Sequence, residues 1–311
     1  LWDASAGSQT SDTATNLAAG TYTVTVTDQK GCSDDTTVTV LEPDALVANT
    51  TAQDSVSCNG LFDGSASVGG VVGGNGVYSY LWDASAGSQT SDTATNLAAG
   101  TYTVTVTDQK GCSDDTTAPV LEPDALAANT TAQDSVSCNG LFDGSASVTV
   151  IGGNLNYSYL WDASAGSQTT DTATNLASGT YTVTVTDQKG CSDDTTVTVL
   201  EPNLLIVDTT FQDSVSCNGL TDGSATVIVS GGNGIYFYQW DVAAGGQTLD
   251  TASNLGAGTY TVTVTDQNGC NLDTAVNVFQ KDSLIIGFIS QDSVTCFGLS
   301  DGSAIVGNIS G

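Results

Sequence analysis

The fold is decided by the stretch TYTVTVT at residues 101–107, in which polar and apolar side chains alternate strictly. A β-strand sends successive side chains to opposite faces of a sheet, so Tyr102, Val104 and Val106 lie on one face and the threonines on the other. β-Branched and aromatic residues also favour the extended backbone. The stretch therefore predicts a strand with one face turned towards a core.

The same reasoning extends along the chain. Further strands are predicted at 78–82, 116–121, 126–137 and 145–151. Glycine-rich turns separate them, such as GGNG at 73–76 and QKG at 109–111, and glycine (35 residues) is far more frequent than proline (4). Because no segment shows the apolar period of a helix, the chain is predicted to be all β.

A long internal repeat organises the sequence. Tryptophan recurs at regular intervals, as Trp2, Trp82, Trp161 and Trp240, and residues 1–68 differ from 81–148 at only three positions. A period of about 79 residues is too long for one turn of a solenoid and suits one small β domain per repeat. Six or seven short strands with frequent turns predict an immunoglobulin-like sandwich, with the tryptophan in its core and Tyr102 in a tyrosine corner.

Domain boundaries follow from this frame. A partial repeat is expected at 1–43, full repeats at 44–123, 124–202 and 203–280, and a second partial repeat at 281–311. Since the chain starts and stops in mid-repeat, it is expected to be a window from a longer array. The motif Leu-Glu-Pro at 41–43 and 121–123 would form the junctions, because proline cannot extend a strand ladder. The alternative is that residues 42–45 form a hairpin turn.

Composition excludes several classes of function. The formal net charge is −30, from 34 acidic residues against four lysines, and the chain has no arginine, histidine or methionine. Without histidine there is no Ser-His-Asp or Cys-His pair and no histidine-bound zinc. So acidic a chain is not expected to bind nucleic acid or an anionic membrane. No apolar run is long enough to span a bilayer, so membrane insertion is not expected.

Cysteines occur twice in each repeat, so that short and long gaps alternate along the chain. The even number and the absence of C-x-x-C pairs favour disulfides in an oxidising, extracellular setting, with free buried thiols as the alternative. We expect all eight to be bonded: Cys32, Cys58, Cys112, Cys138, Cys191, Cys217, Cys270 and Cys296.

The pairing of these cysteines has more than one solution. The turns of Cys58 and Cys112 fall at opposite poles of one sandwich, which argues against a bond between them. A pairing across each short gap, such as Cys32 with Cys58, is favoured because it uses every cysteine. If domains stack end to end, Cys58 could instead meet Cys191.

Three motifs carry a family resemblance. They are VSCNGLFDGSASV at 56–68, GGNGVYSYLW at 73–82 and NLAAGTYTVTVTDQKGC at 96–112. Together they resemble the SprB-type repeat of long surface adhesins of gliding and related Bacteroidota, and parts are similar to the immunoglobulin-like polycystic-kidney-disease domain. The resemblance implies a cell-surface or secreted filament, associated with gliding motility, and supplies no catalytic residues. The fourth copy departs from the pattern at Asn268 and Phe297.

Calcium is one candidate ligand, since each repeat carries many carboxylates and calcium prefers oxygen ligands. The residues that could converge near a junction are Asp108, Asp114, Asp115, Glu122 and Asp124. The alternative is a solvated acidic surface that keeps a long fibre soluble. No EF-hand motif is present, and no cofactor is required.

Covalent O-glycans are a second candidate. The tripeptides Asp-Thr-Ala and Asp-Ser-Val recur in every copy and resemble the O-glycosylation signal of Bacteroidota. This would make the chain a glycoprotein with sugars on Thr13, Thr93, Thr172, Thr251, Ser55, Ser135, Ser214 and Ser293. Copying of one ancestral repeat explains the recurrence equally well.

These observations predict a non-enzymatic structural region of a long extracellular filament or cell-surface adhesin, acting as a stalk. Its partners would be other repeats of its own kind, through tandem packing or lateral bundling, and surfaces or polysaccharide. One alternative is an array of polysaccharide-binding modules that uses Tyr78, Tyr80 or the threonine faces. Another is a spacer between enzymatic domains. Exposed tyrosines would favour the binding array, and buried tyrosines would favour the stalk.

Overall fold

The computed structural model of the protein describes residues 1–310, apart from the side chains of residues 209, 288 and 308–310. It divides into two compact units. The first contains residues 1–126 together with the short loops 152–156 and 187–191, and the second contains the other described residues. Every strand pair named below is antiparallel.

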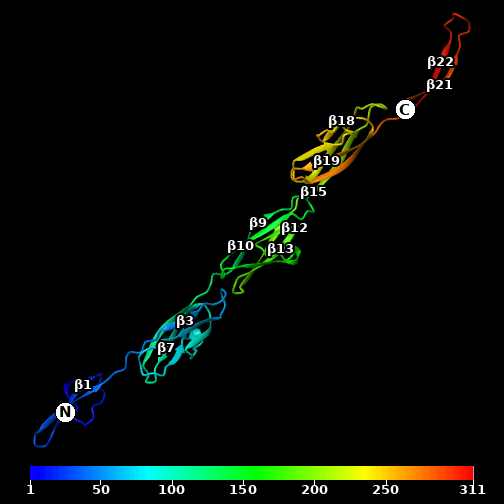
Figure 1. Cartoon of the computed structure of the whole chain (residues 1–311). Coiled ribbons are helices and arrows are strands. Elements are labelled where there is room, and N and C mark those ends of the chain that lie inside the picture. Colours follow the sequence, from blue (N-terminus) through cyan, green and yellow to red (C-terminus); the bar gives the residue numbers. More distant parts are fainter. Residues whose placement is uncertain (311) are drawn as a thin grey trace. The chain divides into compact units, whose positions relative to one another are not determined.

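The first unit contains one complete sandwich of two three-stranded sheets (Figure 1). One sheet has the order β3-β4-β6, formed by Thr50–Asp54, Gly64–Val68 and Thr93–Leu97. The other has the order β5-β7-β8, formed by Ser79–Trp82, Gly100–Thr107 and Ser113–Val120. The chain thus crosses between sheets after β4, after β5 and after β6. This order is the Greek-key arrangement of an immunoglobulin-like sandwich.

Alternation along the strands builds the core of this sandwich. In β7, Tyr102, Val104 and Val106 are buried, while the threonines between them remain partly accessible. Trp82 lies at the centre, only 1% exposed, and its indole Nε1 donates a hydrogen bond to the Ser91 carbonyl at 2.9 Å. The predicted tyrosine corner is confirmed, because the Tyr102 hydroxyl donates to the Ala98 carbonyl at 3.0 Å.

The first unit also contains a partial repeat before this sandwich. It consists of the short 3-10 helix η1, Ala4–Ala6, and the hairpin of β1, Gly20–Thr27, with β2, Ser33–Val40. Trp2, Ala6 and Tyr22 form a small buried cluster. Because β2 pairs with β1 and β3 pairs with β4, residues 41–46 connect two different sheets. The hairpin turn considered for residues 42–45 is therefore not formed.

The second unit repeats the same topology twice. Its first sandwich contains β9 Ala127–Asp134, β10 Gly144–Ile151, β11 Ser158–Trp161, β12 Thr172–Leu176, β13 Gly179–Thr186 and β14 Ser192–Val199. Its second contains β15 Asn203–Asp213, β16 Gly223–Gly232, β17 Tyr236–Trp240, β18 Thr251–Leu255, β19 Gly258–Asp266 and β20 Asn271–Val278. A hairpin of β21, Ile285–Asp292, and β22, Ser303–Ser310, follows. Trp161 and Trp240 are each 1% exposed in their cores.

One strand and one turn in each complete repeat were not predicted from the sequence. Strand β6 has the sequence TATNL, in which only Ala94 and Leu97 are buried, so it lacks the alternation that predicts a strand. Asn96 between them has a left-handed φ of 57°, which interrupts the pleat. After β5, Asp83 caps the 3-10 helix η2, Ala84–Ala86, by accepting a hydrogen bond from the Ala86 amide. Strands β8 and β9 also end before the predicted limits, at Val120 and Asp134.

Candidate functional site: the cysteine turns

A buried aspartate organises the turn between the last two strands of each complete sandwich, β7 and β8 in the first. Among the described residues the only buried charged side chains are these aspartates, Asp108, Asp187 and Asp266. Asp108 Oδ1 accepts the amides of Lys110 and Cys112 at 2.8 and 3.0 Å. Its Oδ2 accepts the backbone amide and the side-chain Nδ2 of Asn75 at 2.8 and 2.9 Å. One carboxylate therefore fixes the cysteine turn and joins it to a second loop.

These contacts also set the titration of the aspartates. Hydrogen bonds from the Asn75 side chain, and then from the Cys112, Asn75 and Lys110 amides, hold the pKa of Asp108 well below its usual value despite its burial. Burial is the largest influence on the pKa of Asp187 and opposes ionisation. Hydrogen bonds from Asn154, Lys189 and Cys191 outweigh it, so this pKa is also lowered. The folded turn therefore favours the charged carboxylate.

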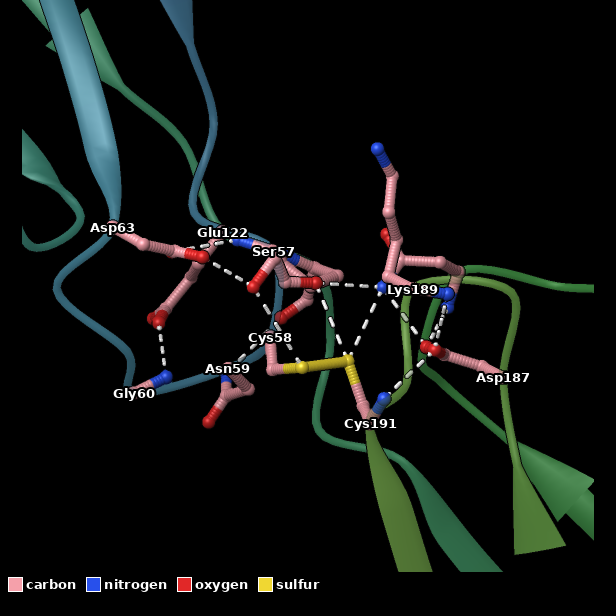
Figure 2. The surroundings of a disulfide bond; sticks show 11 residues. Ser57, Cys58, Asn59, Gly60, Asp63, Glu122, Asp187, Lys189 and Cys191 are labelled. Carbon is pink, nitrogen blue, oxygen red and sulfur yellow. Dashed lines mark hydrogen bonds between the residues drawn. A yellow bond between two sulfur atoms is a disulfide. The ribbon is translucent and has the colours of Figure 1, made fainter.

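A first disulfide joins Cys58 to Cys191, which are 133 residues apart in the sequence. Their Cα atoms are 5.6 Å apart, which is within the usual range for a disulfide. Figure 2 shows the loop of Ser57 and Cys58 against the turn that carries Asp187 and Cys191. Beside the bond, the Asn154 side chain donates to the Ser57 carbonyl at 2.8 Å. Because Asn154 also donates to Asp187, the buried carboxylate aligns the donor that accompanies the disulfide.

The Cys58 loop is itself held in shape. Asp63 accepts hydrogen bonds from the Ser57 amide at 2.9 Å and the Ser57 hydroxyl at 2.5 Å. The Gly60 amide donates to Glu122 at 3.1 Å, which ties the loop to the segment after β8 (Figure 2). The Ser57 hydroxyl, the Ser57 amide and, more weakly, the positive charge of Lys189 lower the pKa of Asp63. The loop thus presents a fixed carbonyl and sulfur to its partner.

A second disulfide has the same construction in the second unit. Cys138 is bonded to Cys270, 132 residues further along, with a Cα–Cα distance of 5.6 Å. Here Asn233 donates to the Ser137 carbonyl at 3.0 Å and to Asp266 at 3.0 Å. The recurrence shows that the bonding of one repeat's first cysteine to the next repeat's second cysteine is a property of the repeat.

The pairing across each short gap is therefore wrong, and the expectation that all eight cysteines are bonded is also wrong. Within the part of the chain that the structure describes, four cysteines are free and exposed: Cys32, Cys112, Cys217 and Cys296. The physical reason is geometric. Cys32 and Cys58 lie in different repeats with the β2-to-β3 connection between them, whereas the Cys191 turn brings its sulfur directly to Cys58. The alternative that Cys58 meets Cys191 is confirmed.

The five carboxylates considered for calcium do not form a shared site. Asp108 is saturated by amide donors, Asp114 accepts the Ala48 amide at 2.9 Å, and Glu122 accepts the Gly60 amide. Asp115 and Asp124 are exposed. Over residues 1–310, no three histidine, cysteine, aspartate or glutamate side chains are placed to hold a metal ion. Amide donors occupy both oxygens of Asp108 and one oxygen each of Asp114 and Glu122.

The candidate O-glycan positions differ in accessibility. Thr13 and the four serines are exposed: Ser55, Ser135, Ser214 and Ser293. The other three threonines are only partly exposed, on the strands β6, β12 and β18, and each bonds a hydroxyl on the neighbouring strand. These pairs are Thr93 with Ser67, Thr172 with Ser147 and Thr251 with Thr226. Glycosylation therefore stays a prediction, and the serines are the more accessible acceptors in the folded chain.

The role of three asparagines beside the cysteine turns was not predicted from the sequence. Asn75, Asn154 and Asn233 each follow a Gly-Gly pair, and this recurrent tripeptide was interpreted only as a turn. Gly73, the first glycine of the first pair, has a φ of +73°, and a Cβ there would lie 2.0 Å from the Ala45 carbonyl oxygen. The glycines thus permit the close backbone approach that brings Asn75 to Asp108. Two motifs recur together in the complete repeats: Gly-Gly-Asn, and an aspartate four residues before the second cysteine. Their joint recurrence was the signal in the sequence that could have indicated this contact.

Paired three-stranded sheets, a buried tryptophan and a tyrosine corner define the class as tandem immunoglobulin-like sandwiches. The chain carries three SprB repeats, because the family model described as SprB repeat matches residues 50–87, 130–166 and 209–245. These repeats indicate the repeat region of a cell-surface adhesin. Each match includes the first cysteine of a repeat and ends before the second, so the bonded turn lies outside the matched segments. No curated protein sequence matches the chain.

Solved structures of several tandem-domain proteins are similar to the chain at low identity. An adhesin described as Ca²⁺-stabilized, which helps an Antarctic bacterium bind ice, is 18% identical over 84% of this chain and 80% of its own, with a TM-score of 0.35. The eight N-terminal Ig domains of Down Syndrome Cell Adhesion Molecule are 11% identical over 88% and 52%, with a TM-score of 0.27. Domains 1–6 of the surface layer protein SbsC are 14% identical over 95% and 49%, with a TM-score of 0.26. The chain spans about half the length of the last two.

The buried aspartate gives a pH-dependent prediction. Because folding lowers the pKa of Asp108 below its usual 3.8, its stabilising contribution is complete above that pH and is lost as the pH falls further. Asp108→Asn should lower the unfolding midpoint at pH 7 and reduce the difference between pH 7 and pH 2. Thermal unfolding across this range measures both effects. Asp115→Asn, at an exposed position of β8, is the matched control and should behave like the unsubstituted chain.

Proposed function

We propose that the chain is a load-bearing, non-catalytic stalk of an extracellular surface adhesin. The observation that supports this most directly is the pair of disulfides that link the three complete repeats in succession. Cys58–Cys191 and Cys138–Cys270 enclose overlapping stretches of sequence, so tension applied along the backbone is transferred between repeats through covalent bonds. Disulfides are maintained in oxidising, extracellular settings, which agrees with the SprB repeats.

The composition suits this role. A formal charge of −30 favours solubility and opposes non-specific aggregation. The charged groups that are buried, such as Asp108, serve the turns that carry the cysteines and are occupied by amide donors. Among the described residues, no helix is long and apolar enough to cross a membrane.

The tyrosines do not support the alternative of a polysaccharide-binding array. Tyr78 and Tyr80 are partly buried and pack against the core of the first complete sandwich. The Tyr78 hydroxyl is engaged, since it donates to the Gly73 carbonyl at 2.8 Å. Sugar-binding platforms need an aromatic face that is open to the ligand, and these rings instead extend the core.

Two measurements on the intact, oxidised protein test the proposal. Antibodies against the chain should label source cells without permeabilisation, and a glycan array should show no saturable binding. Label that appears only after lysis would contradict the extracellular role. Saturable binding to a polysaccharide that Tyr80→Ala abolishes, while the exposed control Leu81→Ala retains it, would establish the binding array instead.

A further inference from the structure

Asparagine followed by glycine is a reactive pair, because glycine has no Cβ to hinder attack of its amide nitrogen on the asparagine side chain. The chain contains six Asn-Gly pairs. Four of them lie in the first junction, closed by Cys58–Cys191, or in the second junction, closed by Cys138–Cys270. These four begin at Asn59, Asn139, Asn233 and Asn268. Both partners of each disulfide are present, so the surroundings of the four pairs can be compared directly.

Hydrogen bonds restrain the two pairs that directly follow a first cysteine. Asn59 Nδ2 donates to the Pro123 carbonyl at 3.0 Å, and the Gly60 amide donates to Glu122 at 3.1 Å. The pair that begins at Asn139 is held by equivalent contacts, at 3.1 and 3.2 Å. The side chain and the attacking nitrogen must therefore each break a hydrogen bond before they can react. The carboxylate also opposes loss of the amide proton, which would leave a second negative charge beside it.

The pair that begins at Asn233 is restrained through its side chain. Asn233 Nδ2 donates to the Asp266 carboxylate and to the Ser137 carbonyl, both at 3.0 Å, and the residue is half-buried. Rotation of this side chain towards the following glycine would break both bonds. Such a side chain is held away from the attacking nitrogen.

Asn268 is the exception among the four. It is exposed, and over the described residues its side chain forms no hydrogen bond, although its backbone amide donates to Asp266 at 2.9 Å. The Gly269 amide donates to a neutral acceptor, the Asp266 carbonyl, at 3.1 Å. A Cβ at Gly269 would meet no atom within 4 Å, and the same holds at Gly60 and Gly140. Hydrogen bonding, rather than crowding, therefore separates Asn268 from the restrained pairs.

The turn around Asn268 otherwise matches the turn of the first junction, where Lys189 occupies the equivalent position. Asp187 binds the amides of that lysine and of Cys191 at 2.8 and 3.0 Å. Asp266 binds the amides of Asn268 and of its cysteine at 2.9 and 3.0 Å. The two turns thus share one backbone arrangement and differ in the side chain that precedes the glycine.

We propose that Asn268 is a site of spontaneous deamidation, at which the second junction ages. The Gly269 nitrogen loses its proton and attacks Cγ of Asn268, the Cγ–Nδ2 bond breaks, and ammonia leaves. The product is a five-membered succinimide ring. Water then opens the ring at either carbonyl and gives aspartate or isoaspartate, so the reaction consumes one water, releases one ammonia and needs no oxidant. This inference goes beyond the stalk function and does not depend on it.

The isoaspartate product would disturb the turn that carries the disulfide. It inserts one methylene into the backbone between residue 268 and Gly269. Since a single carboxylate oxygen of Asp266 binds the amides of residues 268 and 270, we expect the longer backbone to lose one of these two bonds. Both products also place a negative charge where the first junction has a lysine, whose positive charge lowers the pKa of Asp63.

The test incubates the intact, oxidised chain at mildly alkaline pH, with its free thiols capped by iodoacetamide, and follows each pair by peptide mapping. Deamidation is detected as the mass gain of replacing NH with O, and electron-transfer fragmentation distinguishes isoaspartate from aspartate. Asn268 should be converted at least tenfold faster than Asn59 or Asn139, because those pairs must first break two hydrogen bonds. In denaturant the four pairs should react at similar rates. Equal rates in the folded chain, or the same ranking in denaturant, would overturn the proposal.

Asn268→Lys is the matched variant, since the first junction carries lysine in the same turn. It should abolish the mass gain in the peptide around residue 268, and a gain that persists there would place the reaction elsewhere and overturn the assignment. In the unsubstituted chain, hydrogen exchange at the Cys270 amide should become at least tenfold faster in the isoaspartate fraction. Slow exchange in that fraction would overturn the expected effect on the turn.

A second variant tests why the other pairs are protected. Glu201→Ala removes the acceptor of the Gly140 amide and should speed conversion of Asn139, while the rate at Asn268 stays within twofold. An unchanged rate at Asn139 would overturn the protective role assigned to the glutamate.

Discussion

Pulling the oxidised chain by its ends should release about half the contour length that the reduced chain releases. Reduction allows the whole backbone from Cys58 to Cys270 to extend, whereas the intact disulfides leave a shortest covalent path that includes only the backbone between Cys138 and Cys191. At roughly 3.3–3.6 Å per extended residue, reduction should add about 55 nm. Single-molecule force spectroscopy with and without reductant measures this difference.

Single variants sharpen that experiment because the two enclosed stretches overlap. With Cys58→Ser, only Cys138–Cys270 remains, and it should keep about 45 nm of backbone contour length from extending. With Cys138→Ser, Cys58–Cys191 should keep a similar length from extending. The two bonds together should withhold far less contour length than the sum of these two values. Cys32→Ser is the matched control and should change nothing, since Cys32 is free. Additive lengths, or four short hidden segments of about 9 nm each, would contradict the observed pairing.

Replacing Trp82 with alanine should destabilise the first complete sandwich by about 3–5 kcal/mol, through lost apolar burial and the cavity that remains. The indole is 1% exposed and also bonds the Ser91 carbonyl. A sandwich of this size has a stability of roughly 4–12 kcal/mol, so one substitution removes a large part of it. Hydrogen exchange should show β5, β7 and β8 losing protection first.

The neighbouring residue provides the control for this prediction. Leu81 lies on the opposite face of β5 and is 53% exposed, so Leu81→Ala should change stability by no more than about 0.5 kcal/mol. Chemical denaturation followed by exchange measurements compares the two variants. If Trp82→Ala costs less than about 1 kcal/mol, or if Leu81→Ala costs as much, the indole is not the centre of this core.

Much of the fold could be predicted because burial alternates visibly along several strands. Tyr102, Val104 and Val106 follow the period of a strand, and the structure buries all three. Strand β6 could not be predicted in this way, since its threonines and Asn96 give no alternation and a bulge opens its pairing with β4. The position of β6 is determined by its pairing with β4, and a local sequence pattern does not predict such a long-range contact.

The pairing of the cysteines shows why the site was harder to predict than the fold. Geometry argued against a bond between Cys58 and Cys112, which lie in one sandwich, but left Cys32 and Cys191 as alternatives for Cys58. Both spacings recur along the chain because the repeats are nearly identical, so the sequence does not choose between them. Asn154 distinguishes the alternatives in the structure by binding the Ser57 carbonyl. The sequence around Asn154, however, predicts only a turn.

The overlap of the two disulfides also bears on how the chain withstands proteases. A single cut of the backbone anywhere from Cys58 to Cys270 falls within Cys58–Cys191, within Cys138–Cys270, or within both. The two fragments consequently remain one covalent molecule after any one such cut. An exposed turn such as the one at Lys110 can be nicked without loss of the distal half, which gives the protein a tolerance to damage that its fold alone would not provide.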